Sequence, residues 1–302
     1  MCDPMQLTPR DLALLQFLDR TPVTVSQILK ASVAFEGGPF RDERRARERL
    51  QALSRGSFVH SYSLGVTGGG LANYYKLTVE AYRVLHGSEA ALPHRSFFAE
   101  LSPSRLLHTL SLADLIVHTY TTAHAWRLRI TGFHRENELV LETGTHRVSP
   151  DCHVQLSTAG RTYNVLFELD RSTEPLDSTA TSSIRTKILA YEAYQNYVWG
   201  IWKRGGGREQ RPYFRVAFVT TTADRAHHIL GLAQDCARNR DRKLCYATTI
   251  DQFLAEPDAL RSPLFLDHYG NWQALVNEHP SARFIRSPVR INPRVQPVLP
   301  LD

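Results

Sequence analysis

The chain of 302 residues has few cysteines and no long hydrophobic run. Its four cysteines are Cys2, Cys152, Cys236 and Cys245, and no two of them form a CxxC pair. This spacing argues against a structural zinc site and is typical of reduced thiols in a cytosolic protein. No stretch approaches the roughly 18 apolar residues of a membrane helix, and residues 1–10 carry no signal-like apolar region. We therefore expect a cytoplasmic protein without a membrane partner.

Several common catalytic motifs are also missing. The sequence has no GxxxxGK[ST] phosphate loop, no HExxH motif and no nucleophile elbow. Its glycine triplets at residues 68–70 and 205–207 lack the strand–glycine–helix context of a nucleotide site. No internal repeat is evident. The sequence therefore gives no support for a P-loop nucleotide site, an HExxH zinc site or Ser-His-Asp hydrolysis.

The overall composition is that of a basic globular protein. Hydrophobic residues make up 42% and charged residues 22% of the chain, which is ordinary for a globular fold. The length leaves room for about two domains. The net charge of +6 favours an acidic partner.

Residues 1–90 have the pattern of a small helical domain that ends in a β-hairpin. Thr8 and Pro9 are typical of a helix start, and Gly56 of a helix end. The expected elements are helices at residues 8–20, 24–29 and 42–55, strands at 58–66 and 73–77, and a helix at 78–86. This order predicts a winged helix-turn-helix DNA-binding domain.

The third expected helix is cationic on one side and apolar on the other. The two stripes are Arg44, Arg47, Gln51 and Arg55, and opposite them Ala46, Leu50 and Leu53. Such a helix is expected to dock in a major groove, where arginine binds guanine edges and phosphates. A solvated charged helix is the alternative, because Glu43 and Glu48 partly offset the arginines. The predicted DNA contacts are Arg41, Arg44, Arg45, Arg47, Arg49, Gln51 and Arg55.

The rest of the chain alternates between strand and helix patterns. After a linker at residues 91–104, a mixed α/β domain is expected over residues 105–279. Its expected elements are a helix at 106–122, strands at 126–131, 138–142, 151–156 and 163–170, a helix at 184–199, a strand at 214–221, a helix at 224–240 and a strand at 244–248. The basic, proline-containing tail at residues 280–302 is expected to be extended, as an additional polyanion contact or a disordered end.

Three carboxylates stand at the ends of two neighbouring expected strands. Asp151 begins one strand, and Glu168 and Asp170 end the next. Because side chains alternate between the faces of a strand, Glu168 and Asp170 project together, next to Asp151 if the strands pair through a turn at residues 159–160. Converging oxygen ligands suit a hard cation, and we expect Mg²⁺ or Mn²⁺. The three acids are the predicted metal ligands and catalytic residues; solvated strand ends are the alternative.

Lys187 is the predicted cation of this site. On the wheel of the helix at residues 184–199 it lies at the edge of the apolar stripe, near Tyr191. A lysine that leans toward the buried side needs a partner, and the carboxylates are natural ones. Its ammonium would stabilise a pentavalent phosphate or orient an attacking water. Arg171, Glu174 and Tyr191 are expected to support the cluster, with a purely local Arg171–Glu174 salt bridge as the alternative.

The order of elements resembles the PD-(D/E)xK restriction-endonuclease-like fold over roughly residues 105–250. The matching pieces are Pro150-Asp151, a hairpin, Glu168-Leu169-Asp170, and a following helix and strand. The lysine that the family places two residues after the glutamate is Asp170 here, and Lys187 matches a placement on the following helix. The resemblance implies a nuclease-like domain, and Asp170 is its departure from the pattern.

The chain as a whole resembles the bacterial replication-relaxation family over most of residues 7–250. The matching stretches are Leu7-Thr8-Pro9-Arg10-Asp11, the arginine-rich helix, Tyr74-Tyr75-Lys76-Leu77-Thr78, His108 with Leu112-Ala113-Asp114-Leu115, Pro150-Asp151, Glu168 to Glu174, Lys187 with Tyr191, and Phe218-Val219-Thr220 with Arg225. The resemblance implies work on the DNA of a plasmid or other mobile element.

Together these patterns predict a mixed α/β protein: a winged helix-turn-helix followed by a restriction-endonuclease-like mixed sheet flanked by helices. The expected partner is double-stranded DNA, and the expected role is replication or relaxation through metal-dependent phosphodiester cleavage, as a DNA endonuclease or nickase. The competing interpretation is a non-catalytic regulator. Its nuclease-like domain would then serve dimerisation or contacts with replication or mobilisation proteins.

Overall fold

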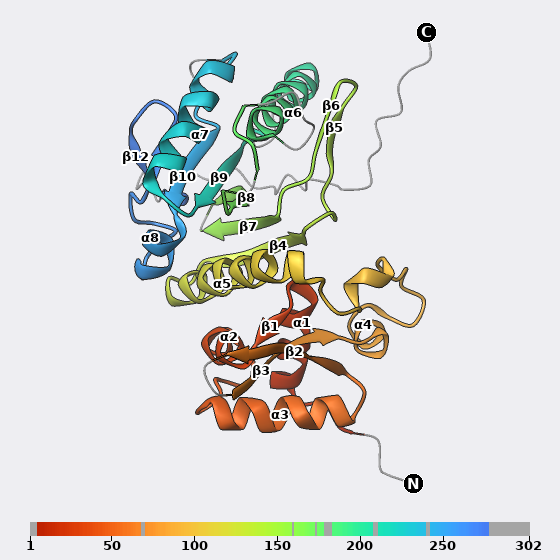
Figure 1. Cartoon of the computed structure of the whole chain (residues 1–302). Coiled ribbons are helices and arrows are strands. Elements are labelled where there is room, and N and C mark those ends of the chain that lie inside the picture. Colours follow the sequence, from red (N-terminus) through yellow and green to blue (C-terminus); the bar gives the residue numbers. More distant parts are fainter. Residues whose placement is uncertain are drawn as a thin grey trace. The chain divides into compact units, whose positions relative to one another are not determined.

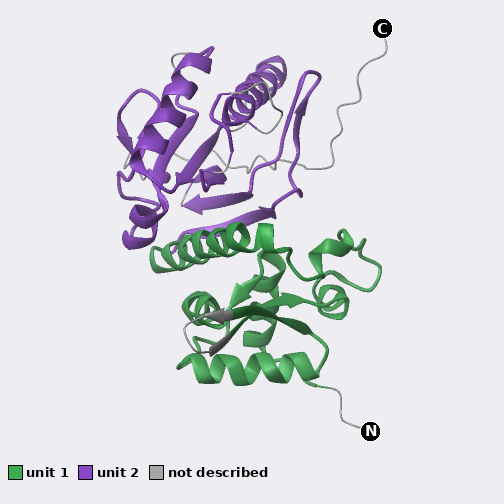
Figure 2. Cartoon of the chain, in the orientation of Figure 1, with its two compact units in different colours: residues 1–126 green, residues 127–302 purple. Residues whose placement is uncertain are grey.

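The computed structural model describes residues 5–67, 70–158, 160–172, 174–177, 183–207, 211–239 and 242–277. The chain forms two compact units, Met1–Trp126 and Arg127–Asp302 (Figure 2). The basic tail expected at residues 280–302 lies outside the described residues, as do residues 68, 69 and 159 of the expected turns. Within the described ranges, every helix is too short or too polar to cross a membrane.

The first unit contains helices around a small antiparallel sheet (Figure 1). Its elements are α1 (Pro9–Arg20), β1 (Val23–Thr24), α2 (Val25–Ala31), the 3-10 helix η1 (Ser32–Ala34), α3 (Glu43–Arg55), β2 (Val59–Thr67), β3 (Gly70–Leu77), α4 (Val79–His86), the 3-10 helix η2 (Arg95–Phe97) and α5 (Pro103–Ala125). The strand order is β1-β3-β2. Three helices followed by a β-hairpin is the order predicted for a winged helix-turn-helix, and that assignment stays a prediction.

Local sequence signals position the helices of this unit. The Thr8 side chain accepts a hydrogen bond from the Asp11 amide, and the Asp11 carboxylate accepts one from the Thr8 amide, so that α1 begins with a capping box. Asp42 caps α3 in the same way, by accepting from the backbone of Arg45. The apolar stripe of α3 is fully buried, as predicted; its members are Ala46, Leu50 and Leu53. Packing of this stripe leaves the opposite face of α3 to solvent.

Helix α5 belongs to the first unit, which differs from the predicted domain boundary at residues 91–104. The Gln27 amide of α2 donates to the Leu110 carbonyl at 3.1 Å and to Asp114 Oδ1 at 2.8 Å. The ring of Tyr120 meets Phe17 edge to face, with centroids 5.4 Å apart. Apolar side chains lie on several sides of α5, so the hydrophobic periodicity of its sequence does not predict which element the helix packs against. The sequence therefore did not place α5 in the first unit.

The second unit is built on a mixed seven-stranded sheet, which confirms the predicted mixed α/β class. Its elements are β4 (Arg129–Arg135), β5 (Leu141–Thr143), β6 (His146–Val148), β7 (Cys152–Thr158), β8 (Arg161–Asp170), α6 (Ile184–Arg204), β9 (Phe214–Thr220), α7 (Ala223–Cys236), β10 (Cys245–Thr249), α8 (Ile250–Ala255), β11 (Phe265–Asp267) and β12 (Trp272–Gln273). The strand order is β12-β11-β10-β9-β8-β7-β4, and β9 is parallel to β8 and β10. The β5–β6 ribbon is separate and packs beside α6 (Figure 1).

The register of β7 and β8 decides which acids meet. The strands are antiparallel, with Cys152 opposite Phe167, and the Asp151 amide donates to the Phe167 carbonyl at 3.1 Å. One step along the ladder, Asp151 therefore stands beside Glu168. Residues that face each other across a ladder share a face of the sheet. This is the face covered by α6, whose buried side includes Ile184, Ile188 and Tyr191.

Candidate functional site

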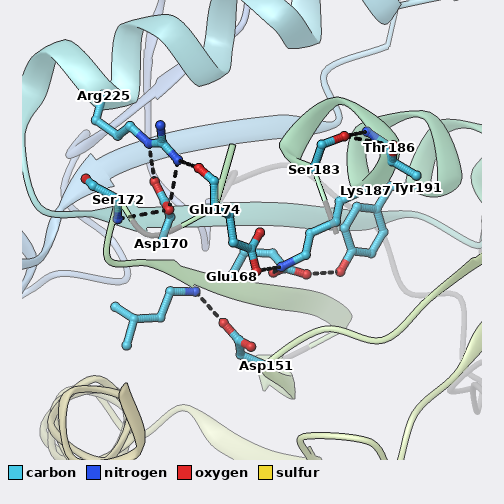
Figure 3. Close-up of polar contacts among 11 residues, drawn as sticks. Asp151, Glu168, Asp170, Ser172, Glu174, Ser183, Thr186, Lys187, Tyr191 and Arg225 are labelled. Carbon is cyan, nitrogen blue, oxygen red and sulfur yellow. Dashed lines mark hydrogen bonds and ion pairs between the residues drawn. The ribbon is translucent and has the colours of Figure 1, made fainter. Parts of the chain in front are cut away.

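Glu168 is the centre of a buried polar cluster at the end of β8 (Figure 3). Lys187 Nζ donates to Glu168 Oε2 at 2.9 Å, and the Tyr191 hydroxyl donates to Glu168 Oε1. Lys187 and Tyr191 lie four residues apart on α6, and this spacing places both side chains on one side of the helix. The contact expected between Lys187 and the carboxylates is therefore present, and Glu168 provides it.

Asp151, at the start of the neighbouring strand β7, is the third carboxylate near Lys187. Its Oδ2 accepts a hydrogen bond from the Leu169 amide at 2.7 Å, which ties the start of β7 to the end of β8 (Figure 3). Its negative charge contributes to raising the pKa of Glu168 and that of Lys187. Asp151 and Glu168 therefore act electrostatically on the same lysine.

Glu174 joins Lys187 instead of the predicted partner Arg171. Lys187 Nζ donates to Glu174 Oε1 at 2.9 Å. In the described part of the chain, Arg171 forms no ion pair. The other oxygen of Glu174, Oε2, is buried and has no hydrogen-bond partner among the described residues. An unsatisfied buried carboxylate oxygen costs free energy, so this atom marks a position at which a donor or a cation would be favourable.

Asp170, predicted as the third metal ligand, is held by an arginine. Arg225 on α7 contacts both of its oxygens, with Nε 2.6 Å from Oδ2 and Nη2 3.1 Å from Oδ1. Asp170 also accepts from the Thr220 hydroxyl and the Ser172 amide. The same guanidinium donates to the Glu174 carbonyl at 2.6 Å. Asp170 therefore anchors the segment after β8. Arg225 holds Asp170 and the Glu174 backbone in place, and the alternation of side chains along β8 did not predict this role. Arg225 does belong to one of the stretches that resemble the replication-relaxation family.

Burial and charge set the protonation of the cluster. Burial raises the pKa of Glu168 to about 7, and the nearby charge of Lys187 limits this rise. Burial alone would lower the pKa of Lys187, but the charges of Glu168, Asp151 and Glu174 outweigh it and raise that pKa. Lys187 is therefore a permanent cation near neutral pH. It can orient a phosphate or a water, but it does not accept a proton.

The donor atoms bear on whether a divalent cation would fit. Asp151 and Glu168 offer two carboxylates from adjacent strands, and Mg²⁺ usually takes one or two carboxylates with further oxygen ligands. The orphaned Glu174 oxygen belongs to the carboxylate whose other oxygen pairs with Lys187. Among the described residues, no group of three or more His, Cys, Asp or Glu side chains is arranged to hold a metal. Asp170 is held by Arg225, and metal binding by Asp151 and Glu168 stays a prediction.

The cationic face of α3 is exposed. Arg44, Arg45 and Arg47 keep 67%, 57% and 50% of their side-chain surface in solvent. Their ion pairs among the described residues are with Glu48 and Glu43 of the same helix. Exposed pairs of this kind contribute about 0–1 kcal/mol, so they exchange easily for phosphate. The other exposed members of the predicted set are Arg41, Gln51 and Arg55.

Arg49 has a different partner from the one predicted. Its guanidinium binds both carboxylate oxygens of Asp11, with Nε 2.5 Å from Oδ1. Asp11 is fully buried, and although burial would raise its pKa, the hydrogen bonds from Arg49 and Thr8 lower it overall. Arg49 therefore joins α3 to α1 and is withdrawn from the predicted DNA contacts.

Comparison with known proteins gives a family and similar solved structures of a restriction endonuclease. The sequence model of the replication-relaxation family matches residues 15–208. The structure of restriction endonuclease FokI is similar with a TM-score of 0.27 and 12% identity, covering 83% of this chain and 43% of that chain. The structure of FokI bound to DNA gives the same TM-score and identity, with 83% and 44% coverage. The chain thus spans less than half the length of either. No curated protein matches its sequence.

Proposed function

The chain belongs to the replication-relaxation family, and from this premise we propose that it binds duplex DNA through α3 and cleaves one strand through the cluster of Asp151, Glu168 and Lys187. Membership of the family supports a DNA-related function. The duplex-binding surface and the cleavage reaction are the finer parts of the proposal. Each part has its own support and its own experiment.

The support for duplex binding is the division of α3 into two faces. The buried stripe fixes the helix in its unit, and Arg44, Arg47 and Arg55 remain exposed on the other side. Guanidinium groups bind phosphates and guanine edges in a major groove. Each phosphate that is neutralised releases condensed counterions, so binding of this kind weakens steeply with salt.

A gel-shift salt series tests this surface. The Arg44/Arg47/Arg55→Ala triple variant should bind duplex DNA on the order of 10- to 100-fold more weakly at low salt, with a slope of log affinity against log salt smaller by about 3. A charge-matched control, Arg83/Arg95/Arg147→Ala, removes three exposed arginines outside α3 and should bind nearly as the wild type does. Equal binding by the α3 variant and the wild type would show that α3 is not the surface.

The observation that carries the cleavage proposal is a partly buried cation held among carboxylates at the end of the sheet. Lys187 Nζ lies 2.9 Å from both Glu168 Oε2 and Glu174 Oε1, and Asp151 stands beside Glu168 on the neighbouring strand. Asp151 and Glu168 would hold Mg²⁺ or Mn²⁺, which supplies charge stabilisation at a phosphate and a more acidic water when bound. Lys187 would orient the phosphate or the attacking water through its fixed charge.

The same contacts also support a second, non-catalytic function, because the carboxylates of Glu168 and Asp170 already have hydrogen-bond partners within the protein. Both oxygens of Glu168 already accept hydrogen bonds, and both oxygens of Asp170 are held by Arg225. A cluster satisfied in this way can serve stability alone. The chain would then be a DNA-binding regulator whose second unit contacts a second copy or another protein. The two functions differ in one observable, the metal-dependent nicking of supercoiled plasmid and its dependence on Glu168.

A further inference from the structure

We propose that the end of α6 and the segment entering β9 form a stacking platform for single-stranded DNA. The platform consists of three aromatic rings and three cations: Trp199, Trp202 and Tyr213, with Lys203, Arg204 and Arg211. None of these residues belongs to α3 or to the Glu168 cluster. The inference therefore adds a second DNA-binding surface to the proposed function and does not depend on cleavage.

The three rings are stacked on one another. Trp199 and Trp202 lie at i and i+3 on α6, with centroids 4.8 Å apart and planes at 27°. Tyr213, which directly precedes β9, lies against Trp199 with centroids 5.4 Å apart and planes at 21°. The Tyr213 carbonyl accepts a hydrogen bond from the Asn164 amide of β8 at 3.4 Å, so the segment is attached to the sheet. The rings thus form a ladder of nearly parallel faces on a rigid support.

Two of the three cations, Lys203 and Arg211, lie over these rings. Lys203 Nζ is 5.4 Å from the Trp199 centroid, and the Arg211 guanidinium carbon is 5.8 Å from Trp199 and 5.9 Å from Trp202. The three basic side chains are exposed. Within the described ranges none of them pairs with a carboxylate, in contrast to the arginines of α3. Among the residues that the structure describes, the platform therefore carries positive charge that no carboxylate pairs with.

Exposure argues that the platform is a surface and not a part of the core. Tyr213 keeps 45% of its surface in solvent, and Trp199 and Trp202 are half-buried. Nearby on α6, Ile201 is 46% exposed. Tyr213 therefore presents an aromatic ring to water beside these cations, and this combination suits a ligand that has both flat apolar faces and negative charge.

Single-stranded DNA has this chemistry. Proteins bind it by stacking its bases on aromatic rings and placing cations along its phosphates. In a duplex the base faces are covered by their neighbours, so the rings would not be used. Membership of a family concerned with DNA replication favours DNA over RNA as the strand. The platform would hold a strand released when a duplex is opened or nicked.

The test is fluorescence anisotropy of a labelled oligothymidylate of about 12 nucleotides, a length within the range bound by single-stranded DNA-binding folds, titrated with the full chain. Tyr213→Ala removes an outer ring of the ladder and should weaken binding roughly 5- to 100-fold, the loss expected when one base–ring stack is removed. Trp199→Ala removes the inner ring against which both outer rings stack and should weaken binding as well. Trp272→Ala is the matched control, because Trp272 is 58% exposed on the edge strand β12. It should bind as the wild type does.

Further variants keep the proposal falsifiable if an alanine variant folds poorly. Trp199→Phe retains a ring and should restore most of the binding that Trp199→Ala loses. Lys203→Gln/Arg211→Gln should weaken binding and lower its salt dependence by a slope of roughly 1. The α3 variant Arg44/Arg47/Arg55→Ala should keep oligothymidylate binding while it loses duplex binding, which separates this proposal from the duplex proposal.

Three results would overturn the platform. The first is folded Tyr213→Ala and Trp199→Ala proteins that bind oligothymidylate as tightly as the wild type. The second is an equal loss in Trp272→Ala. The third is tighter binding of an oligouridylate of equal length, which would assign the surface to RNA. A change in oligomeric state of the ring variants with unchanged oligothymidylate binding would instead identify a protein interface and equally reject the proposal.

Discussion

At the scale of single residues, the charge of Lys187 determines the state of the site. Three carboxylates surround its ammonium, and two of them accept hydrogen bonds from it. The fixed cation allows acids that would repel one another to remain close together. The surrounding carboxylates raise the pKa of Lys187 and so favour its charged form, in which it acts as a cation.

Lys187→Met should lower the free energy of unfolding at pH 7 by on the order of 3 kcal/mol, because removal of one partner leaves buried carboxylates uncompensated. Chemical denaturation with Lys30→Met as the control would measure it, since Lys30 is an exposed lysine on α2. Duplex binding should be unchanged. A loss no larger than that of Lys30→Met would show that Lys187 does not hold the cluster together.

The loss in Lys187→Met should also depend on pH. Without the ammonium, the folded-state pKa of Glu168, already raised to about 7 by burial, would rise further above its ordinary value of 4.5. A pKa raised in the folded state stabilises the protein below the ordinary value, and this stabilisation is lost as the pH rises through the folded value. Both proteins lose this stabilisation alike between pH 4.5 and about 7, so the deficit should be nearly constant there and grow as the pH rises above 7, toward the higher pKa of the variant. A deficit that stays constant above pH 7 as well would contradict this account.

At the scale of elements, the arginines of α3 have different roles: Arg49 holds α3 against α1, whereas several others face solvent. Arg49 binds the fully buried Asp11 of α1, whereas Arg44 lies on the exposed face with Glu48. Two arginines five residues apart on one helix therefore have opposite roles. Sequence spacing alone did not separate them, because the partner of Arg49 lies 38 positions away in the chain.

Arg49→Ala should destabilise the protein by about 3 kcal/mol, because it leaves the Asp11 carboxylate buried and unpaired. Arg44→Ala should change stability by less than about 1 kcal/mol, since its ion pair is exposed. Thermal or urea unfolding of both variants measures the difference. Similar stabilities for the two would mean that the Asp11 contact does not hold α1 against α3.

At the scale of the whole molecule, local patterns predicted the elements, and long-range contacts decided which residues work together. Strand alternation and the helical wheel were enough to place Lys187 near Glu168, because both patterns are local and repeat regularly. They failed for Asp170, which pairs with Arg225 from a helix 55 residues later. They also failed for the boundary of the first unit, because the partner of α5 is set by Gln27 and Phe17, far away in the sequence.

The measurement that tests the central proposal most directly is nicking of supercoiled plasmid by the full chain, with Mg²⁺ or Mn²⁺ and with chelator. The wild type should convert supercoiled to open-circular DNA only when the metal is present. Glu168→Gln should lose this activity by about 100-fold or more, as expected when a group that acts on the reacting atoms is removed. Glu142→Gln, which alters an exposed acid on the separate ribbon β5, should retain it. A wild type that nicks with neither metal, or a folded Glu168→Gln protein that nicks at the wild-type rate, would contradict catalysis by this cluster and favour the non-catalytic regulator.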